Sequence, residues 1–159
     1  MSATGRVARL NMSAGGVPKR PIPRARVSAA GMEGDRQRHS TIHGGPDRAL
    51  CLWSLELIEA LRGEGHPVVP GSAGENVTVS GIDWAQVVPG ARLCVGEALV
   101  EVTSYTDPCR TIRGSFAHGR IGRISQKSHP GWSRVYARVI EGGEVGVGDT
   151  VRVVARGEI

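Results

Sequence analysis

The chain is poor in cysteine and in aromatic residues. Its three cysteines, Cys51, Cys94 and Cys109, are widely spaced and form no Cys-x-x-Cys pair. An odd, dispersed set argues against a cysteine-built zinc site and indicates a reducing compartment. Aromatic residues make up only 4% of the sequence. The basic stretches therefore lack interleaved aromatic side chains for stacking on bases, which disfavours a nucleic-acid partner.

Long apolar runs are also missing. No stretch approaches the roughly 20 residues that a helix needs to cross a bilayer, and the amino terminus has no apolar signal segment. We therefore expect a cytoplasmic protein without a membrane partner. Internal repeats and low-complexity tracts are absent too, so we expect one domain spanning residues 1–159.

Glycine, proline and arginine are abundant instead. The 159 residues include 23 glycines and 9 prolines, which indicates frequent turns and a mainly β fold with one or two short helices. The net charge is +5, and Lys19 and Lys127 are the only lysines, so nearly all of the positive charge is arginine. Arginine binds phosphates and carboxylates with a two-pronged donor, which would suit an anionic ligand. A genomic bias toward arginine explains the same composition.

Alternating apolar residues predict the strands. Residues 6–12 place Ala8, Leu10 and Met12 on one face and Val7 on the other. The hairpin signal is Gly96-Glu97, which joins strands predicted at 92–95 and 98–105. Other strands are predicted at 25–29 as an edge-like strand, and at 49–53, 77–79, 132–140 and 150–155, with a turn at 141–144.

Ser54 is a good N-cap for a helix from Leu55 to about Arg62, and Ile58 and Leu61 belong to its core stripe. A short irregular helix is predicted around residues 116–124. Both Cys51 and Cys94 lie in apolar, strand-like runs, so we expect them to be inert core residues.

The stretch from Thr106 to Ile112 carries the strongest chemical signal. Pro108 forbids the preceding strand from continuing, so Cys109 should lie on a turn at a strand end, with its sulfur facing outward. Arg110 beside it and Arg113 one turn on would favour the thiolate, the form that acts as nucleophile or soft metal ligand. The alternative is a small buried hydrophobic residue, as most free cysteines are.

Residues 31–48, GMEGDRQRHSTIHGGPDR, contain almost nothing to bury. Loops of this length in a compact domain are usually functional or disordered. A metal site at His39 and His43 is disfavoured, because their spacing suits a helix and His-Gly-Gly-Pro is not helical. A solvated surface loop is the plain interpretation. The third interpretation of this segment is an anion-binding loop, with Arg36, His43 and Arg48 as the donors.

The segment Gly71-Ser72-Ala73-Gly74 leads into Glu75 and Asn76, just before a strand. Glycines before a carboxylate and an amide indicate that one of these two side chains points into a site. They could equally satisfy neighbouring backbone groups.

Six short motifs in fixed order resemble the MOSC domain, the molybdenum cofactor sulfurase C-terminal domain family, and in particular its small stand-alone bacterial-type members. Each is weak alone, but together they span nearly the whole chain. They are Gly16-Val17-Pro18-Lys19, Gly34-Asp35-Arg36, His43-Gly44-Gly45-Pro46-Asp47-Arg48-Ala49, Gly74-Glu75-Asn76, Pro108-Cys109 and Gly148-Asp149.

The resemblance implies a barrel-like β domain in the cytosol, in which Cys109 is the functional cysteine. In members similar to the mitochondrial amidoxime-reducing proteins, that cysteine is the protein ligand of a molybdenum held by a pterin dithiolene. We therefore expect molybdenum cofactor, with Cys109 as the metal ligand. Expected cofactor-binding residues are Arg36, His43, Gly44, Gly45, Arg48, Asn76, Arg110 and Thr111. Pyridoxal phosphate is not expected, because neither lysine lies in a Schiff-base setting.

By this resemblance the chain is an oxidoreductase that reduces N-hydroxylated small molecules at a Cys109-bound molybdenum. Two electrons would come from a partner reductase, and protons from Asp107 or water. The alternative is a carrier without turnover, holding a persulfide on Cys109 or passing on the cofactor to a transfer partner.

Two departures from the family pattern bear on this expectation. Many members carry an arginine ahead of the Pro-Cys pair, where this chain has Tyr105-Thr106-Asp107. The chain also ends at Ile159 without the C-terminal extension of the bacterial reductases. A second subunit could supply the remaining surface, so an oligomer is compatible with the sequence.

Overall fold

The computed structural model describes residues 4–13, 17–35 and 46–154. The strands are β1 (Thr4–Met12), β2 (Arg20–Ile22), β3 (Arg24–Ser28), β4 (Gly31–Met32), β5 (Leu50–Ser54), β6 (Val77–Ser80), β7 (Arg92–Val95), β8 (Ala98–Tyr105), β9 (Val135–Glu141), β10 (Gly143–Gly146) and β11 (Thr150–Val153). The helical elements are α2 (Leu55–Gly63) and the short 3₁₀ turns η1 (Pro46–Arg48), η2 (Trp84–Gln86), η3 (Arg110–Ser115), η4 (Ala117–Gly119) and η5 (Ile121–Ile124).

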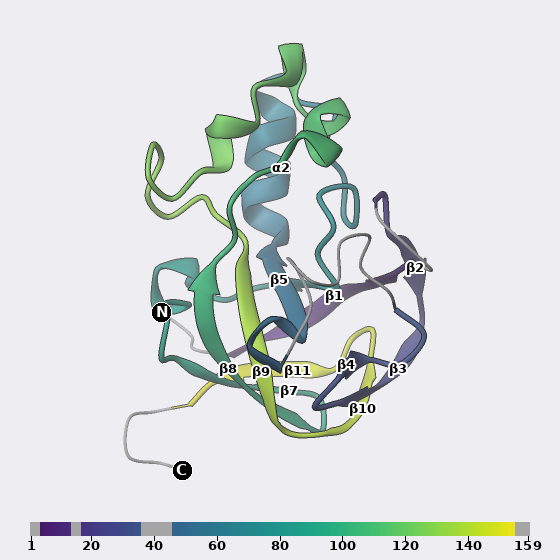
Figure 1. The fold of residues 1–159 in the computed structure, drawn as a ribbon. Coiled ribbons are helices and arrows are strands. Elements are labelled where there is room, and N and C mark those ends of the chain that lie inside the picture. Colours follow the sequence, from purple (N-terminus) through teal and green to yellow (C-terminus); the bar gives the residue numbers. More distant parts are fainter. Residues whose placement is uncertain (1–3, 14–16, 36–45, 155–159) are drawn as a thin grey trace.

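A closed β barrel forms the body of the molecule (Figure 1). Eight strands make one sheet in the order β11-β7-β8-β9-β5-β6-β1-β2, and β11 also pairs with β1. That extra pairing closes seven of the eight strands into a ring, with β2 outside it. Closure leaves no unpaired edge in the ring. The predicted mainly β, barrel-like fold is confirmed.

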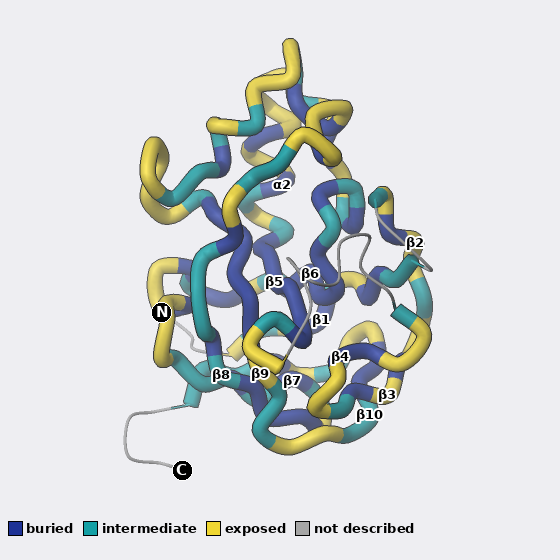
Figure 2. Tube along the Cα trace, viewed as in Figure 1, coloured by how far each residue is buried: buried dark blue, intermediate teal, exposed yellow. Residues whose placement is uncertain are grey.

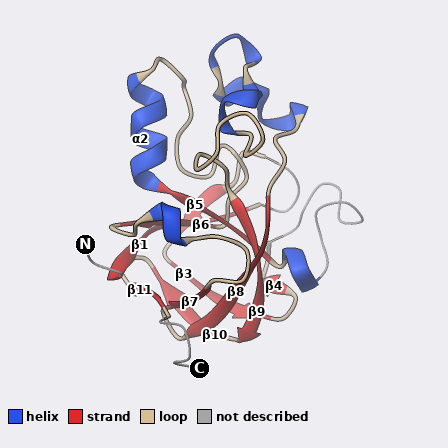
Figure 3. Cartoon of the chain, turned by 90° about the vertical axis from the view of Figure 1, so that its left-hand side faces the viewer, coloured by secondary structure: helices blue, strands red, loops and turns tan. Residues whose placement is uncertain are grey.

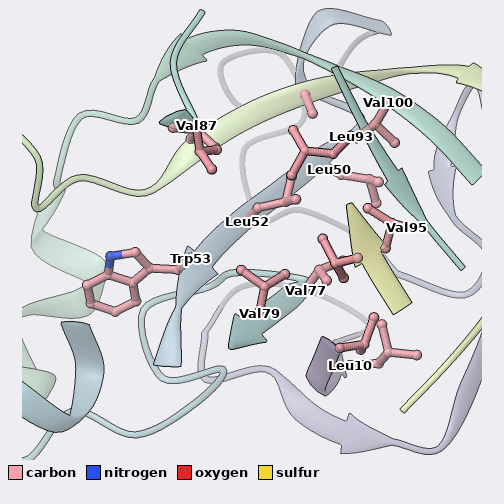
Figure 4. Packing of buried hydrophobic residues seen from close by; sticks show 14 of the residues in the cluster. Leu10, Leu50, Leu52, Trp53, Val77, Val79, Val87, Leu93, Val95 and Val100 are labelled. Carbon is pink, nitrogen blue, oxygen red and sulfur yellow. The ribbon is translucent and has the colours of Figure 1, made fainter. Parts of the chain in front are cut away.

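Aliphatic side chains from most strands of the ring fill the barrel (Figure 4). Leu50 and Leu52 of β5 are buried there, and they alternate with residues that face the outside of the wall. The same interior receives side chains from the neighbouring and facing strands, namely Leu10, Val77, Val79, Leu93, Val95 and Val100.

The alternation predicted for the first strand is wrong at one position. The register between β1 and β6 shifts between Val7 and Arg9, where an extra residue interrupts the ladder. A bulge of this kind breaks the period of two. As a result, Val7 and Leu10 are both buried, although strict alternation places them on opposite faces.

A second, three-stranded sheet was not predicted as such. It has the order β10-β3-β4, so β3 is its central strand rather than an edge strand. The predicted turn at 141–144 is shorter than expected, because β10 begins at Gly143 and pairs with β3. Gly142 makes the close approach possible, since a Cβ there would lie 2.4 Å from the Val27 carbonyl oxygen.

The predicted helix is confirmed as α2, which follows β5 directly. Ser54 caps it by accepting a hydrogen bond from the Leu57 backbone N–H at 3.3 Å, and Ile58 and Leu61 are buried. α2 gathers with η3, η4 and η5 at one end of the barrel (Figures 1 and 3). None of the described helices has the length and hydropathy needed to span a membrane.

The predicted strand at 132–140 begins later than expected, at Val135. Trp132, Ser133 and Arg134 instead form the approach to β9, and Ser133 and Arg134 are buried. The hairpin of β7 and β8 has the predicted boundaries, with Gly96 at φ +56° in the turn.

Candidate functional site

Cys109 lies on a turn at the end of a strand, as the sequence predicted. β8 ends at Tyr105, and η3 begins at Arg110. Cys109 itself has extended backbone angles, φ −129° and ψ 168°, and is half-buried. Its sulfur lies 2.7 Å from the hydroxyl oxygen of Thr111. The thiol is thus presented next to a hydroxyl at the surface rather than sealed in the core.

The Cys109 turn, residues 106–109, is tied to the approach to β9. The Thr106 N–H donates to the Arg134 carbonyl at 3.0 Å, and the Ser133 hydroxyl donates to the Thr106 carbonyl at 3.1 Å. The Arg134 guanidinium donates to the Asp107 carbonyl at 3.3 Å. The Asp107 side chain is exposed, as is that of Arg110. The predicted roles of Asp107, Arg110 and Thr111 stay predictions.

A second thiol lies close to this turn. Cys51 of β5 pairs with Tyr136 of β9, and it faces away from Leu50 and Leu52, toward the outside of the barrel wall. Its sulfur lies 4.0 Å from the Thr106 hydroxyl oxygen. Although outside the ring, Cys51 is only 4% exposed, and this burial raises the pKa of its thiol. β5 is buried along its whole length (Figure 2).

Tyr136 connects this buried thiol to the positive charge of Arg48. The Arg48 guanidinium carbon lies 5.2 Å from the centre of the Tyr136 ring, a cation–π distance. Burial raises the pKa of Tyr136 to about 12, and the nearby thiols of Cys51 and Cys109 act in the same direction. The carbonyl of the neighbouring Asp47 accepts a hydrogen bond from the Thr103 hydroxyl. The structure therefore brings Arg48 to the same face as Cys51.

Asn76 belongs to a buried polar cluster beside Cys51. Its side-chain oxygen accepts from the Cys51 backbone N–H at 2.9 Å, and its amide donates to Asp35 at 2.8 Å. Asp35 also forms an ion pair with Lys19 at 2.5 Å, and both side chains are buried. Asn76 thus satisfies neighbouring groups, which was one of the two predicted alternatives. Its predicted contact with a pterin stays a prediction.

Glu75 is fully buried on the same segment. One carboxylate oxygen accepts from the Gly71 N–H and from the Thr78 hydroxyl, each at 3.0 Å. The other oxygen has no hydrogen-bond partner among the described residues. Burial raises the pKa of this carboxyl. A buried carboxyl with a raised pKa therefore adjoins Asn76.

Four of the predicted cofactor-binding residues, Arg36, His43, Gly44 and Gly45, lie outside the described residues, as does His39. Their roles stay predictions. The motif Gly148-Asp149 has a structural role: the Asp149 carboxylate accepts from the Gly146 N–H at 2.8 Å, in the turn between β10 and β11.

The expectation for Cys94 is wrong in one respect. It lies on β7 but is half-buried rather than core, and its sulfur lies 3.9 Å from the Arg152 guanidinium. Alternation along β7 turns Leu93 and Val95 inward and Cys94 outward.

Sequence reasoning missed Arg134 and Tyr136 as members of this site. Arg134 carries no local signal, since its partners are backbone carbonyls of distant loops. Tyr136 lies within the predicted strand at 132–140, where it alternates with the apolar Val135 and Ala137. That alternation could have identified it as a residue facing the outside of the barrel wall.

The family model of the MOSC domain matches residues 39–152. The chain is 32% identical over 148 residues to the uncharacterized protein YflK of Bacillus subtilis, a match that covers 90% of this chain and 65% of YflK. It is also 32% identical over 139 residues to the protein YiiM of Escherichia coli, covering 82% of this chain and 59% of YiiM. The chain thus spans less than two thirds of the length of these relatives.

Solved structures show the same fold. YiiM from Geobacillus stearothermophilus superposes with a TM-score of 0.74 at 23% identity, covering 98% of this chain and 78% of that one. The YUAD protein of Bacillus subtilis superposes with a TM-score of 0.71 at 18% identity, covering 94% and 95%.

Proposed function

The chain belongs to the MOSC domain family, which is generally linked to molybdenum cofactor binding, and we propose that it binds this cofactor through Cys109 and reduces N-hydroxylated small molecules. The observation that carries the proposal is the placement of Cys109: half-buried, on a turn at the end of β8, with the Thr111 hydroxyl 2.7 Å from its sulfur. A thiol that is held in place but reachable suits a soft metal ligand.

The donor set supports a metal that brings most of its own ligands. Within the described ranges, no three His, Cys, Asp or Glu side chains come together to hold a metal ion. Cys109 would therefore supply a single sulfur, while a pterin dithiolene carries further sulfur ligands of its own. Such a division suits molybdenum, which takes thiolate ligands readily.

The chain's other residues would bind and orient. Arg48, which lies over the Tyr136 ring, and the exposed Arg110, which directly follows Cys109, would bind the phosphate of the cofactor, since guanidinium groups bind phosphate well. The exposed Asp107, two residues before Cys109, would exchange protons with water. When bound, the cofactor would supply two-electron redox chemistry. Reduction of an N–OH group to N–H consumes two electrons and two protons and releases water, so a partner reductase must deliver the electrons.

The test measures molybdenum and pterin in protein purified from cells that make molybdopterin. The wild type and Cys94→Ser should carry both in equal amounts, and Cys109→Ser should lose the metal. Cys94 is the matched control because it is also a half-buried thiol but lies on β7, away from the Cys109 turn. Equal metal in Cys109→Ser and wild type would contradict the proposal. Turnover of benzamidoxime with an added reductase then tests the reductase activity itself.

The carrier alternative makes a different prediction in the same samples. A wild-type protein that carries neither metal nor pterin, but has a labile sulfur released from Cys109 by reductant, would support a persulfide carrier instead.

A further inference from the structure

Arg134 lies between the Cys109 turn and the loop that precedes β6. It is 5% exposed and comes directly before β9. Its Nη1 donates to the Ala73 carbonyl at 2.7 Å, and its Nη2 donates to the Asp107 carbonyl at 3.3 Å. Its own carbonyl accepts from the Thr106 N–H at 3.0 Å. A single buried residue thus bonds two loops that are distant in sequence.

We propose that Arg134 is a positioning residue, whose guanidinium holds the Cys109 turn against the loop of residues 70–76 and thereby sets the exposure of the Cys109 sulfur. The inference rests on the proposed function only in treating Cys109 as the functional thiol.

The hydrogen bonds of Arg134 are better explained as positioning two loops than as stabilising the fold. None of the ion pairs within the described residues includes Arg134, and its Nε has no hydrogen-bond partner there. Burying a guanidinium with carbonyl partners alone and one N–H unsatisfied is costly. An apolar side chain would fill the same space at lower cost. What an apolar side chain cannot do is join two separate carbonyl groups.

The planar guanidinium is suited to this geometry. Its N–H groups point in fixed directions, so two of them can reach carbonyls on different loops at the same time. A lysine keeps the positive charge but concentrates its donors on one nitrogen. Arg134→Lys therefore separates the two-pronged geometry from the charge.

The charge of Arg134 also acts on its buried neighbours, since it opposes the rise in pKa that burial causes at Cys51 and at Tyr136. Because lysine retains this charge, a change at Cys109 in Arg134→Lys would report geometry. Arg134→Gln removes both the charge and the two-pronged geometry, so comparison of the two variants distinguishes them.

The experiment measures alkylation of the cofactor-free protein by iodoacetamide, with peptide mass spectrometry following each of the three cysteines. We expect Arg134→Lys and Arg134→Gln to accelerate alkylation of Cys109 by roughly threefold or more, through local opening of the turn. Cys51 and Cys94 should keep their wild-type rates in Arg134→Lys, and in Arg134→Gln, which removes a charge that favours the Cys51 thiolate, Cys51 should react no faster than in the wild type. The control is Arg92→Lys, which alters an arginine of β7 that pairs with Glu101 of β8. It should change the alkylation rate of none of the three cysteines.

The buried Cys51 makes the outcome decisive. If Arg134 only stabilised the fold, its loss would raise alkylation of Cys51 in parallel with Cys109, because both would react through global opening. A parallel rise, or an unchanged Cys109 rate in both variants, would overturn the proposal. Measuring the alkylation rate of Cys109 from about pH 6 to about pH 9 adds a second readout. A change in the exposure of its sulfur multiplies this rate by the same factor at every pH. The assay needs no molybdenum, so its failure is distinct from failure of the proposed function.

Discussion

The sulfur of Cys109 and the hydroxyl oxygen of Thr111 lie 2.7 Å apart, within one turn of the chain and at the surface. Thr111 can reach the sulfur because η3 begins at Arg110 and bends the chain back over Cys109. Either atom can be the donor, and a hydroxyl that donates to the sulfur stabilises negative charge there.

Thr111→Val should therefore slow alkylation of Cys109 at neutral pH by roughly twofold to fivefold, the range of a modest hydrogen bond at an exposed site. Thr111→Ser retains the hydroxyl and should stay near the wild-type rate. Iodoacetamide labelling with peptide mass spectrometry measures both. Equal rates in the valine and wild-type proteins would mean that the hydroxyl does not support the sulfur.

Cys51 should be inert in the native protein. Its thiol is 4% exposed, and burial raises its pKa, so both access and ionisation oppose reaction. At about pH 8 we expect it to be alkylated roughly a hundredfold more slowly than Cys109. Denaturant should abolish the difference. Comparable native rates for the two thiols would contradict the burial described here.

Glu75 should make stability depend on pH in a defined direction. Burial raises the pKa of its carboxyl above the ordinary value of 4.5, so the folded state keeps a proton that the unfolded state releases. Its contribution is fully present below about pH 4.5 and is lost as pH rises through the folded-state pKa, at about 1.36 kcal/mol per pKa unit of difference.

Glu75→Gln removes this titration. The free energy of unfolding of the Gln variant should therefore gain on that of the wild type as pH rises above about 4.5. Urea unfolding of both proteins at several pH values measures the gap. A gap that stays constant from acid to neutral pH would show that Glu75 does not titrate with folding.

Removing only one partner of the ion pair between Lys19 and Asp35 should be costly to stability. Both side chains are buried, at 4% and 7% exposed. Lys19→Met leaves a buried carboxylate and should lower the free energy of unfolding by about 3 kcal/mol, while Lys19→Met with Asp35→Asn should lose less than the sum of the single changes.

The matched control for this pair is Arg138→Gln, which breaks the exposed pair with Glu101 and should cost less than about 1 kcal/mol. Urea unfolding compares the four variants. Additive single changes at Lys19 and Asp35 would mean that the two charges do not depend on each other.

Local patterns in the sequence predicted the elements that local physics controls. Pro108 ended the strand before Cys109, Ser54 capped α2, and Gly96-Glu97 turned the hairpin of β7 and β8. Each depends on the backbone preferences of one or two residues, which neighbours in the chain express directly.

Other features depended on partners far away in the chain. The bulge in β1 shifts its buried face because β6 imposes the register, and β10 pairs with β3 although the sequence around it is typical of a turn. Half-burial of Cys94 and burial of Arg134 are likewise set by strands and loops that pack against them. The periodicity of apolar residues within a segment gives no information about these long-range contacts.

The sequence by itself determined a β-rich chain in which Cys109 follows a strand, because a proline and an alternating apolar run are local and unambiguous. Only the tertiary structure decided that Cys51, Tyr136 and Arg48 share the outer face of the barrel wall, and that Arg134 joins the Cys109 turn to the segment before Glu75. The physical reason is that barrel closure and strand pairing bring together residues whose separation along the chain conveys nothing about their distance in space.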